Sequence, residues 1–270
     1  MAGMASLPGR RTGPQVFAHR GASHERAEHT LGAYLEALDV GADGLECDVR
    51  LTADGHLVCF HDRDLRRTGQ QRGVVSTLEL SDLDQLEFAS WKNPWSDLDD
   101  ELPDRDEALD RVLTLRRLLE TVADCGRRVE LAIETKHPTR YAGLVERRLV
   151  EELRHFGWHR GDSPVRIMSF SYTALQRVER LAPDLRLVML LEKARHWPVV
   201  KPVLGRRWIL GPGIEQLSRH PELGPKLRRT GREINVWTVN TDVQLDLCVD
   251  LGVTTVMTDR PAYLLARLGR

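Results

Sequence analysis

The sequence predicts an α/β fold, a TIM-type (β/α)₈ barrel, on three observations. The chain has 270 residues, close to the roughly 250 that a single barrel of this kind takes. Short apolar runs alternate with amphipathic stretches, which is typical of βα units on a parallel sheet. Eight of these runs are candidates for parallel strands, and eight βα units favour closure into a barrel. A doubly wound open sheet is the alternative fold.

The first βα unit is predicted at residues 16–40. An apolar run at residues 16–18 forms the strand, and residues 30–40 have the spacing of an amphipathic helix. Its apolar side chains recur at i, i+3, i+4 and i+7: Leu31, Tyr34, Leu35 and Leu38. Thr30 is a suitable N-cap, and Gly41 ends the helix.

An antiparallel excursion is predicted next. Residues 44–51 and 57–60 both read as strands, but the link between them is too short for a parallel crossover. Asp54-Gly55 within this link is a strong hairpin signal. A turn centred on Asp54 and the residue before it would place His61 opposite Glu46.

The rest of the barrel follows the same alternation. Helices are predicted at residues 114–122 and 173–181, the second with Thr173 and Gln176 as a capping box. A helix within residues 192–207 is doubtful because this link contains two prolines. The remaining parallel strands are predicted at residues 129–134, 165–170, 187–191, 208–210, 234–239 and 255–257.

The predicted organisation is one domain with an insertion. Residues 1–15 are rich in Gly, Pro and Arg and are expected to be a flexible leader without a signal-peptide core. Residues 16–270 form the barrel, and the polar, irregular stretch at about 64–110 is expected to cover one face of it. The longest apolar run, 187–191, is too short to span a bilayer. The four cysteines form no CxxC pair, which favours reduced thiols and a cytoplasmic location.

Charge limits the class of partner. The chain has 40 acidic and 39 basic residues and a sequence pI near 6.8, without a block of like charge. A surface for nucleic acid is therefore not indicated, although a local basic pocket remains compatible with this balance. A small molecule is the expected partner, and the oligomeric state is left open.

Chemically active side chains gather at predicted strand ends, where TIM barrels carry their reactive groups. Glu46 and Asp48 are two apart and share one strand face, as do Glu134 and Lys136. Singly, each pair reads more simply as a solvated strand face, a turn or a surface ion pair. The chemically active residues selected in this way are His19, Arg20, Glu46, Asp48, His61, Asp62, Glu134 and Lys136.

Taken together, these residues predict metal-assisted chemistry on an anionic substrate. Glu46, Asp48 and Glu134 would repel one another unless a cation lay among them, and oxygen ligands suit Mg²⁺ or Ca²⁺. His19 and His61 could supply an acid and a base, because imidazole titrates near neutrality. Basic side chains suited to a phosphate group stand beside them: Arg20 and Lys136.

The same residues resemble the glycerophosphodiester phosphodiesterases. His19-Arg20-Gly21 is similar to the HRG start of that family, and residues 27–30 to its PENT box. Residues 41–49 resemble GADxxExDV, and residues 52–62 resemble TxDGxxVxxHD. Residues 131–136 resemble LxIEIK, and three later stretches resemble further signatures: 169–170, 236–240 and 258–261. The match covers residues 16–262 in the family's order and spacing.

The resemblance implies hydrolysis of glycerophosphodiesters to sn-glycerol 3-phosphate and an alcohol. It implies that Glu46, Asp48 and Glu134 bind a divalent metal (Mg²⁺, Ca²⁺ or Mn²⁺). By similarity, His19 and His61 are the acid–base pair. By similarity, Arg20 and Lys136 bind the phosphate, and Glu28 lines the site near the glycerol. Trp237 is expected to pack against the carbon skeleton of the substrate, with a place in the barrel core as the alternative.

The departures from the family pattern leave the presumed ligands and acid–base groups intact. Ala27 and His29 replace the Pro and Asn of the PENT box, and we expect His29 to serve the helix entry. The histidines outside the set, including His137, are expected on the surface, and Cys59 is expected to be a packing residue. A lysophospholipase D on the same fold and a non-catalytic binding module are the alternative functions.

Overall fold

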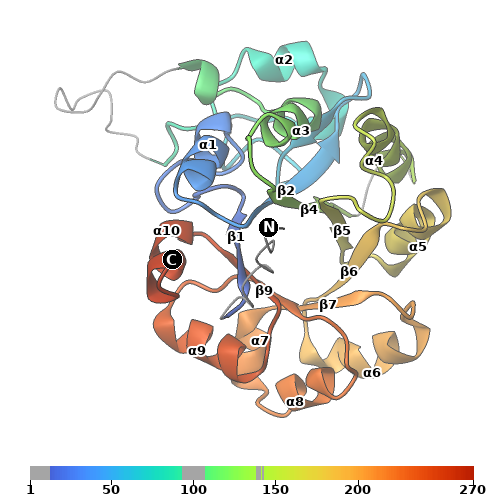
Figure 1. Ribbon diagram of the computed structural model, residues 1–270. Helices are drawn as coiled ribbons and strands as arrows, with labels where there is room; N and C mark the ends of the chain where they lie inside the picture. Colours follow the sequence, from blue (N-terminus) through green and yellow to red (C-terminus); the bar gives the residue numbers. More distant parts are fainter. Residues whose placement is uncertain (1–12, 93–106, 138–140, 142) are drawn as a thin grey trace, which may run out of the picture.

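The computed structural model describes residues 13–92, 107–137, 141 and 143–270. Within these ranges eight parallel strands form an inner ring that helices surround, as Figure 1 shows in a view along the barrel. The predicted TIM-type barrel is confirmed. The open doubly wound sheet is excluded, because the strands at the two ends of the sheet approach each other and pair.

The strand order explains this closure. Hydrogen-bonded neighbours follow β7-β6-β5-β4-β2-β1-β9-β8. Parallel bridges from Leu210 to Ile234 and from Gly213 to Trp237 join the two ends of this order. The parallel strands are β1 (Gln15–His19), β2 (Gly44–Leu51), β4 (Glu130–Thr135), β5 (Val165–Ser169), β6 (Arg186–Leu191), β7 (Ile209–Pro212), β8 (Asn235–Val236) and β9 (Thr255–Thr258).

Several helices begin at a residue whose side chain caps them. Thr30 accepts a hydrogen bond from Ala33 N, as predicted. The predicted capping box at Thr173 was wrong, because Ser171 takes the N-cap position and accepts from Ala174 N instead. The described helices are α1 (Leu31–Asp39), α2 (Leu80–Asp84), α3 (Leu115–Ala123), α4 (Leu144–His155), α5 (Tyr172–Leu181), α6 (Trp197–Val200), α7 (Ile214–Arg219), α8 (Leu223–Arg228), α9 (Asp242–Asp250) and α10 (Pro261–Arg267).

Apolar side chains fill both sides of the barrel wall. The larger cluster lies between the strands and the surrounding helices. A smaller one fills the barrel interior: Phe17, Ala132, Met168, Val188, Leu190, Ile209 and Met257. At the amino ends of the strands the buried Arg166 stacks over Phe17 at 4.6 Å and pairs with Glu130. This ion pair and the apolar plug leave the carboxyl ends of the strands as the face for chemistry.

The hairpin is present, but its predicted register was wrong by one residue. β3 (Leu57–Cys59) pairs antiparallel to β2 with Val49 opposite Cys59. Thr52 N donates to His56 O at 2.9 Å, so the turn centres on Asp54 alone. Pairing His61 with Glu46 is therefore excluded, because a one-residue slip reverses the strand faces.

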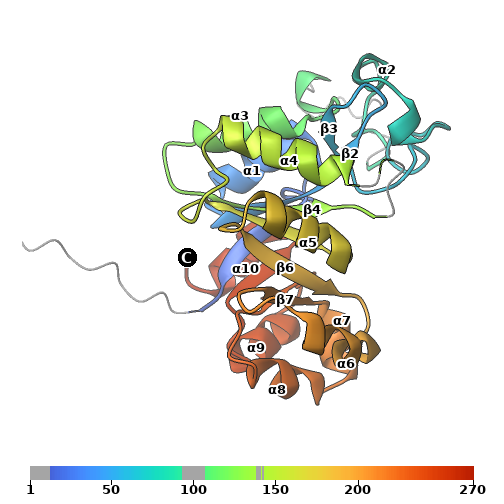
Figure 2. The same ribbon diagram turned by 90° about the vertical axis from the view of Figure 1, so that its right-hand side faces the viewer.

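The segment after the hairpin builds a small cover at the carboxyl end of the barrel. Its apolar cluster is Val58, Phe60, Leu65, Val75, Leu83 and Phe88. Figure 2 shows α2 and β3 on the side toward which the strands point. Residues 93–106 of the predicted insertion and 1–12 of the predicted leader lie outside the described residues.

Among the helices that the structure describes, none has the length and apolar character needed to cross a membrane.

Candidate active site

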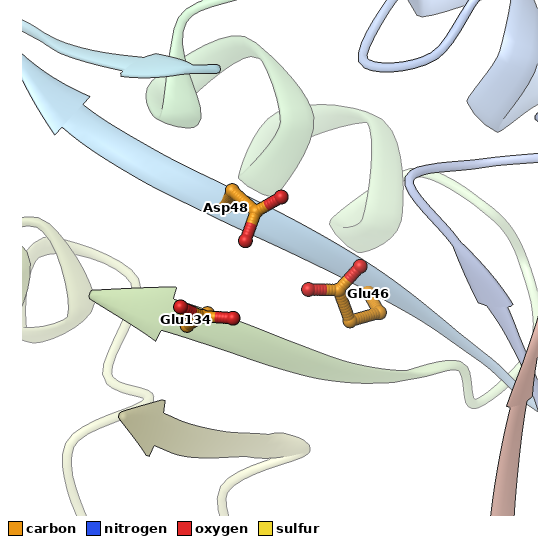
Figure 3. Close-up of side chains that lie close together, drawn as sticks. All are labelled: Glu46, Asp48 and Glu134. Atoms are coloured by element: carbon orange, nitrogen blue, oxygen red, sulfur yellow. The ribbon is translucent and has the colours of Figure 1, made fainter. Parts of the chain in front are cut away.

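Three carboxylates meet at the carboxyl ends of β2 and β4. Glu46 and Asp48 share one face of β2, and Glu134 is the register partner of Asp48 on β4. One oxygen of each carboxylate lies within 4.8 Å of the others. All three side chains are buried. Figure 3 shows them facing a common space between the two strands. The predicted convergence of these residues is thus present in the fold.

Burial and mutual repulsion control the protonation of this cluster. Burial and the charge of Asp48 raise the pKa of Glu46 well above its usual range. The same two causes raise the pKa of Glu134 to about 8. Burial would also raise the pKa of Asp48, but Arg20 and Lys136 outweigh it and hold that pKa well below its usual range. Without a cation, the cluster therefore retains protons at neutral pH.

Two cationic side chains border the cluster. Lys136 Nζ lies 3.2 Å from Asp48 Oδ1 and 2.9 Å from Glu134 Oε1. Arg20 Nη1 donates to Glu28 Oε1 at 3.0 Å, and its Nε lies 3.1 Å from Asp48 Oδ2. Positive charge in this place balances the acidic cluster and provides donors for an anionic group of a substrate.

The turn after β1 places Arg20. Arg20 and Gly21 both have positive φ, 59° and 86°. A Cβ on Gly21 would lie 2.7 Å from Ala33, so only glycine fits where the turn approaches α1. Arg20 N donates to both the main-chain oxygen and Oε2 of Glu46 at 3.1 Å. The same turn therefore fixes the Glu46 carboxylate and the Arg20 guanidinium together.

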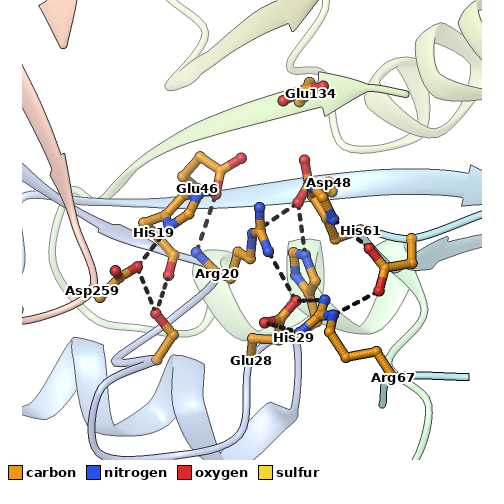
Figure 4. Close-up of polar contacts among 12 residues, drawn as sticks. His19, Arg20, Glu28, His29, Glu46, Asp48, His61, Arg67, Glu134 and Asp259 are labelled. Carbon is orange, nitrogen blue, oxygen red and sulfur yellow. Dashed lines mark hydrogen bonds and ion pairs between the residues drawn. The ribbon is translucent and has the colours of Figure 1, made fainter. Parts of the chain in front are cut away.

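Two imidazoles border opposite ends of the site (Figure 4), each oriented by a carboxylate. His19 Nδ1 lies 2.6 Å from Asp259 Oδ1, and His61 Nδ1 lies 2.7 Å from Asp62 Oδ1. An ionised carboxylate only accepts, so Nδ1 carries the proton in both rings and Nε2 is left for proton exchange. His19 Nε2 lies 4.0 Å from Glu46 Oε2.

The surroundings of His61 keep its ring neutral. Burial lowers the pKa of His61 to about 4, and the charges of Arg20 and Lys136 add to this against the attraction of Asp48. A neutral imidazole with a free Nε2 can accept a proton at physiological pH.

A hydrogen-bond network holds the orienting carboxylate of His19. Asp259 Oδ1 also accepts from Ser23 Oγ at 3.0 Å, and Oδ2 accepts from Asn240 Nδ2 at 2.6 Å. Although burial opposes it, hydrogen bonds from His19, Asn240 and Ser23 lower the pKa of Asp259 to about 2. Asp259 is therefore ionised and fixed in place.

A second network joins His61 to Arg20. Arg67 Nε donates to Asp62 Oδ2 at 2.7 Å, and its two terminal nitrogens donate to both oxygens of Glu28 at 2.7 Å. Burial opposes ionisation of Glu28, but the hydrogen bonds of Arg67 and the charge of Arg20 lower its pKa to about 2. Hydrogen bonds therefore connect His61 to Arg20 through the side chains of Asp62, Arg67 and Glu28.

Comparison with known proteins identifies the family. A model described as the glycerophosphoryl diester phosphodiesterase family matches residues 19–263, which is most of the chain. A probable glycerophosphodiester phosphodiesterase 1 of Mycobacterium tuberculosis (strain ATCC 25618 / H37Rv) is 41% identical over 252 residues, covering 92% of this chain and 90% of the relative. The chain belongs to the glycerophosphoryl diester phosphodiesterase family.

A further relative agrees in sequence, and a solved structure agrees in fold. A glycerophosphodiester phosphodiesterase of Bacillus subtilis (strain 168) is 32% identical over 91% of this chain and 83% of its own length. A phosphodiesterase of Oleispira antarctica, solved with the product sn-glycerol-3-phosphate, has a TM-score of 0.78 at 24% identity and covers 95% of this chain and 97% of its own. The enzyme class expected from the sequence, a phosphoric diester hydrolase, is confirmed by this membership.

Most residues singled out from the sequence lie together in this member of the family. The carboxylates, both imidazoles and their cationic neighbours share one site, and Glu28 is joined to it through Arg20. Trp237 packs against the apolar cluster of the barrel interior. Its Nε1 donates to Gly211 O at 2.9 Å, and its ring meets Phe170 edge to face at 5.5 Å.

One histidine was predicted wrongly, and another has a contact that was not foreseen. His29 lies at the helix entry as expected, directly before the N-cap Thr30, but it is also buried with its Nε2 3.0 Å from Asp48 Oδ2. His137, expected on the surface, is half-buried with Nε2 3.2 Å from Oε1 of the buried Glu146. Each contacts a buried carboxylate on another element of the fold, and periodicity does not indicate such a contact.

Sequence reasoning did not select Asp259 or Arg67, and it selected Asp62 without a role. Asp259 stood within a family signature, and Asp62 directly follows His61, but neither was given a role. The signal that could have indicated them is chemical, because a catalytic imidazole needs an acceptor for its second nitrogen. Arg67 gave no comparable signal.

Proposed function

We propose that this chain hydrolyses glycerophosphodiesters to sn-glycerol 3-phosphate and an alcohol, with a divalent cation bound at the carboxylate cluster. The observation that carries the proposal is the approach of Glu46, Asp48 and Glu134, whose oxygens lie within 4.8 Å of one another at the mouth of the barrel. The Oleispira antarctica relative was solved with sn-glycerol-3-phosphate, which supports the choice of product.

The donor set fits a hard divalent cation. Three buried carboxylates provide only oxygen ligands, which suit Mg²⁺, Ca²⁺ or Mn²⁺. The raised pKa values of Glu46 and Glu134 show the electrostatic cost of the cluster, which a divalent charge would remove. A cation bound there supplies Lewis-acid polarisation of a phosphate oxygen.

In the proposed mechanism, His19 and His61 move the protons. One ring accepts the proton of the attacking oxygen at Nε2, and the other donates a proton from Nε2 to the leaving alkoxide. Each transfer contributes about 10²- to 10⁴-fold to the rate. The neutral state of His61 makes it the candidate base. Asp259 and Asp62 accept from the two Nδ1 atoms and would stabilise the charged ring, which the base becomes on accepting its proton and the acid is before it donates.

The remaining predicted residues would bind the substrate. Arg20 and Lys136 would donate to the phosphate oxygens, since both already stand beside Asp48. Glu28 would accept from a glycerol hydroxyl while Arg67 holds it. Trp237 would pack against the carbon skeleton of the substrate.

The attacking oxygen is water or the glycerol 2-hydroxyl of the substrate, which would pass through a cyclic phosphate. Phosphorus NMR of the reaction separates these routes, because a cyclic phosphate has a signal of its own that rises and then decays.

A substrate panel tests the proposal. Phosphorus NMR should detect sn-glycerol 3-phosphate from glycerophosphocholine, glycerophosphoethanolamine and glycerophosphoglycerol. Turnover should stop with chelator and return with Mg²⁺, Ca²⁺ or Mn²⁺. Absence of product from every diester, with the metal supplied and the protein folded, would support the non-catalytic binding module instead.

The lysophospholipase D alternative has one observation in its favour. Phe170 follows β5 beside Trp237 and is 38% exposed, which places apolar surface near the carboxyl ends of the strands. Lysophosphatidylcholine in the same panel decides between the two. We propose that glycerophosphocholine is turned over faster, because the groups around the carboxylates are charged or polar.

A cytoplasmic location remains our proposal, and the free state of the four cysteines supports it.

A further inference from the structure

His29 joins the start of α1 to the strand that carries two of the carboxylates. Its side chain is buried, with Nε2 3.0 Å from Asp48 Oδ2 and Nδ1 2.9 Å from the hydroxyl of Tyr34. The Tyr34 hydroxyl also lies 3.1 Å from the main-chain oxygen of Glu46. The imidazole is thus held on both sides, by a helix residue and by β2.

The two oxygens of Asp48 face different partners. Oδ2 faces His29 Nε2 at 3.0 Å and Arg20 Nε at 3.1 Å. Oδ1 faces Lys136 Nζ at 3.2 Å on the side of Glu134. His29 and Arg20 therefore both contact Oδ2, whereas Oδ1 lies beside Lys136, whose Nζ also contacts Glu134.

The hydrogen bond between His29 and Asp48 can run in only one direction. Asp48 is ionised and can only accept, so Nε2 of His29 must carry a proton whatever the total charge of the ring. The hydrogen bond therefore does not depend on titration of His29. A hydrogen bond to a carboxylate in a buried site is stronger than one between neutral groups.

We propose that His29 is a positioning residue for the metal ligand Asp48. By donating from Nε2 to Oδ2, it fixes the rotation of the carboxylate and leaves Oδ1 as the oxygen presented to the cation. The inference rests on the proposed function. It assigns a role to a departure from the family pattern, since an Asn stands in that pattern where this chain has His29. An Asn amide nitrogen corresponds to Nδ1 of histidine and would fall short of the place that Nε2 occupies here.

Two variants of similar size distinguish the hydrogen bond that His29 donates from the space that its side chain fills. His29→Gln puts an amide N–H near the position of Nε2, whereas His29→Met has similar length and no donor. Both side chains are unbranched, so the cost of the positive φ of 61° is similar in the two. His220→Ala is the control, because His220 is an exposed residue at the end of α7.

The measurement is Mn²⁺ affinity of the metal-stripped, full-length protein by titration calorimetry, with thermal melting to verify folding. His29→Met should weaken the Mn²⁺ Kd by about 10- to 100-fold, the usual cost of removing a group that orients a ligand. His29→Gln should stay within about 3-fold of the wild type on the same scale. His220→Ala should bind Mn²⁺ as the wild type does.

A further variant changes the other contact of the imidazole, the one between Nδ1 and Tyr34. Tyr34→Phe removes the hydroxyl beside Nδ1 and should weaken the Mn²⁺ Kd less than His29→Met does. At saturating Mn²⁺, His29→Met should regain most of its glycerophosphocholine turnover, because the residue acts on the ligand and not on the substrate.

Equal Mn²⁺ affinity of His29→Met and the wild type would overturn the positioning role alone. Equal weakening in His29→Gln and His29→Met would also overturn it, because the imidazole would then act by packing. A folded wild-type protein that binds no Mn²⁺ would overturn the positioning role and the proposed function together.

Discussion

The exchange of Asp259 for asparagine tests the orientation of His19 most sharply. Asp259 accepts from His19 Nδ1 and Ser23 Oγ through one oxygen and from Asn240 Nδ2 through the other. An asparagine has the same shape but only one acceptor oxygen. Asn240 cannot turn to suit it, because its own oxygen accepts from Thr258 Oγ1 at 3.0 Å and from Asp259 N at 2.9 Å.

The new amide therefore turns its NH₂ group toward His19. The opposite orientation would set two NH₂ groups against each other at the 2.6 Å that now separates Asp259 Oδ2 from Asn240 Nδ2. An NH₂ group at Nδ1 needs an acceptor there, so it favours the neutral ring with its only proton on Nε2 and disfavours the charged ring that an acid must be before it donates. We expect kcat to fall by about 10²- to 10⁴-fold. This range is the usual contribution of one proton transfer, and its upper end is the loss seen when an aspartate beside a catalytic histidine becomes asparagine.

The assay is steady-state turnover of glycerophosphocholine with Mg²⁺, together with thermal melting. Asp259→Asn should lower kcat with little change in KM. Adding Asn240→Asp should restore part of kcat, because the new carboxylate accepts from the asparagine NH₂ and turns its oxygen back to His19. A kcat for Asp259→Asn within about 3-fold of the wild type would refute the tautomer argument.

Four further outcomes are expected. His19→Ala and His61→Ala should each lower kcat by at least about 100-fold with unchanged melting, and a double variant with near-normal turnover would end the acid–base proposal. Because the pKa of Glu134 is about 8, Mn²⁺ binding at pH 7 should release a proton, and the Kd should tighten as pH rises toward 9, which calorimetry in two buffers measures. Since the pKa of His61 falls from 6.5 to about 4 on folding, stability should decline as pH drops through this window, and denaturant unfolding of His61→Ala should show a smaller decline. Arg67→Ala frees two carboxylates at the mouth and should lower kcat/KM by about 10-fold in the same turnover assay, with unchanged kcat/KM as the contrary result.

The barrel could be predicted because its signals are local and repeated. Apolar runs at regular spacing marked all eight parallel strands, and Thr30 marked the start of α1 as a cap. The hairpin turn was recognised, but its register was not. The pairing depends on the Thr52–His56 bond that closes the turn, and residue types alone do not distinguish a turn centred on Asp54 from one displaced by half a residue.

In the candidate site, too, the residues placed by local signals could be predicted and those placed by contacts across the fold could not. Glu46, Asp48 and Glu134 could be brought together from sequence because the first two share a face of one strand, Glu134 lies near the end of the next parallel strand, and alternation fixes the face of each. His29 and Asp259 could not be, because their roles depend on contacts across the fold. His29 reaches β2 from the loop before α1, and Asp259 reaches β1 from the end of β9. The contact of Asp259 follows from closure of the barrel, which brings the first and last strands side by side.

The most direct test of the account is the anomalous diffraction of manganese in crystals of the metal-stripped protein soaked with Mn²⁺. We expect one strong anomalous peak within coordinating distance of Glu46, Asp48 and Glu134, with the Nε2 atoms of His19 and His61 on either side of it. A fully active protein whose manganese lies elsewhere, with these three carboxylates making no contact to it, would contradict the account.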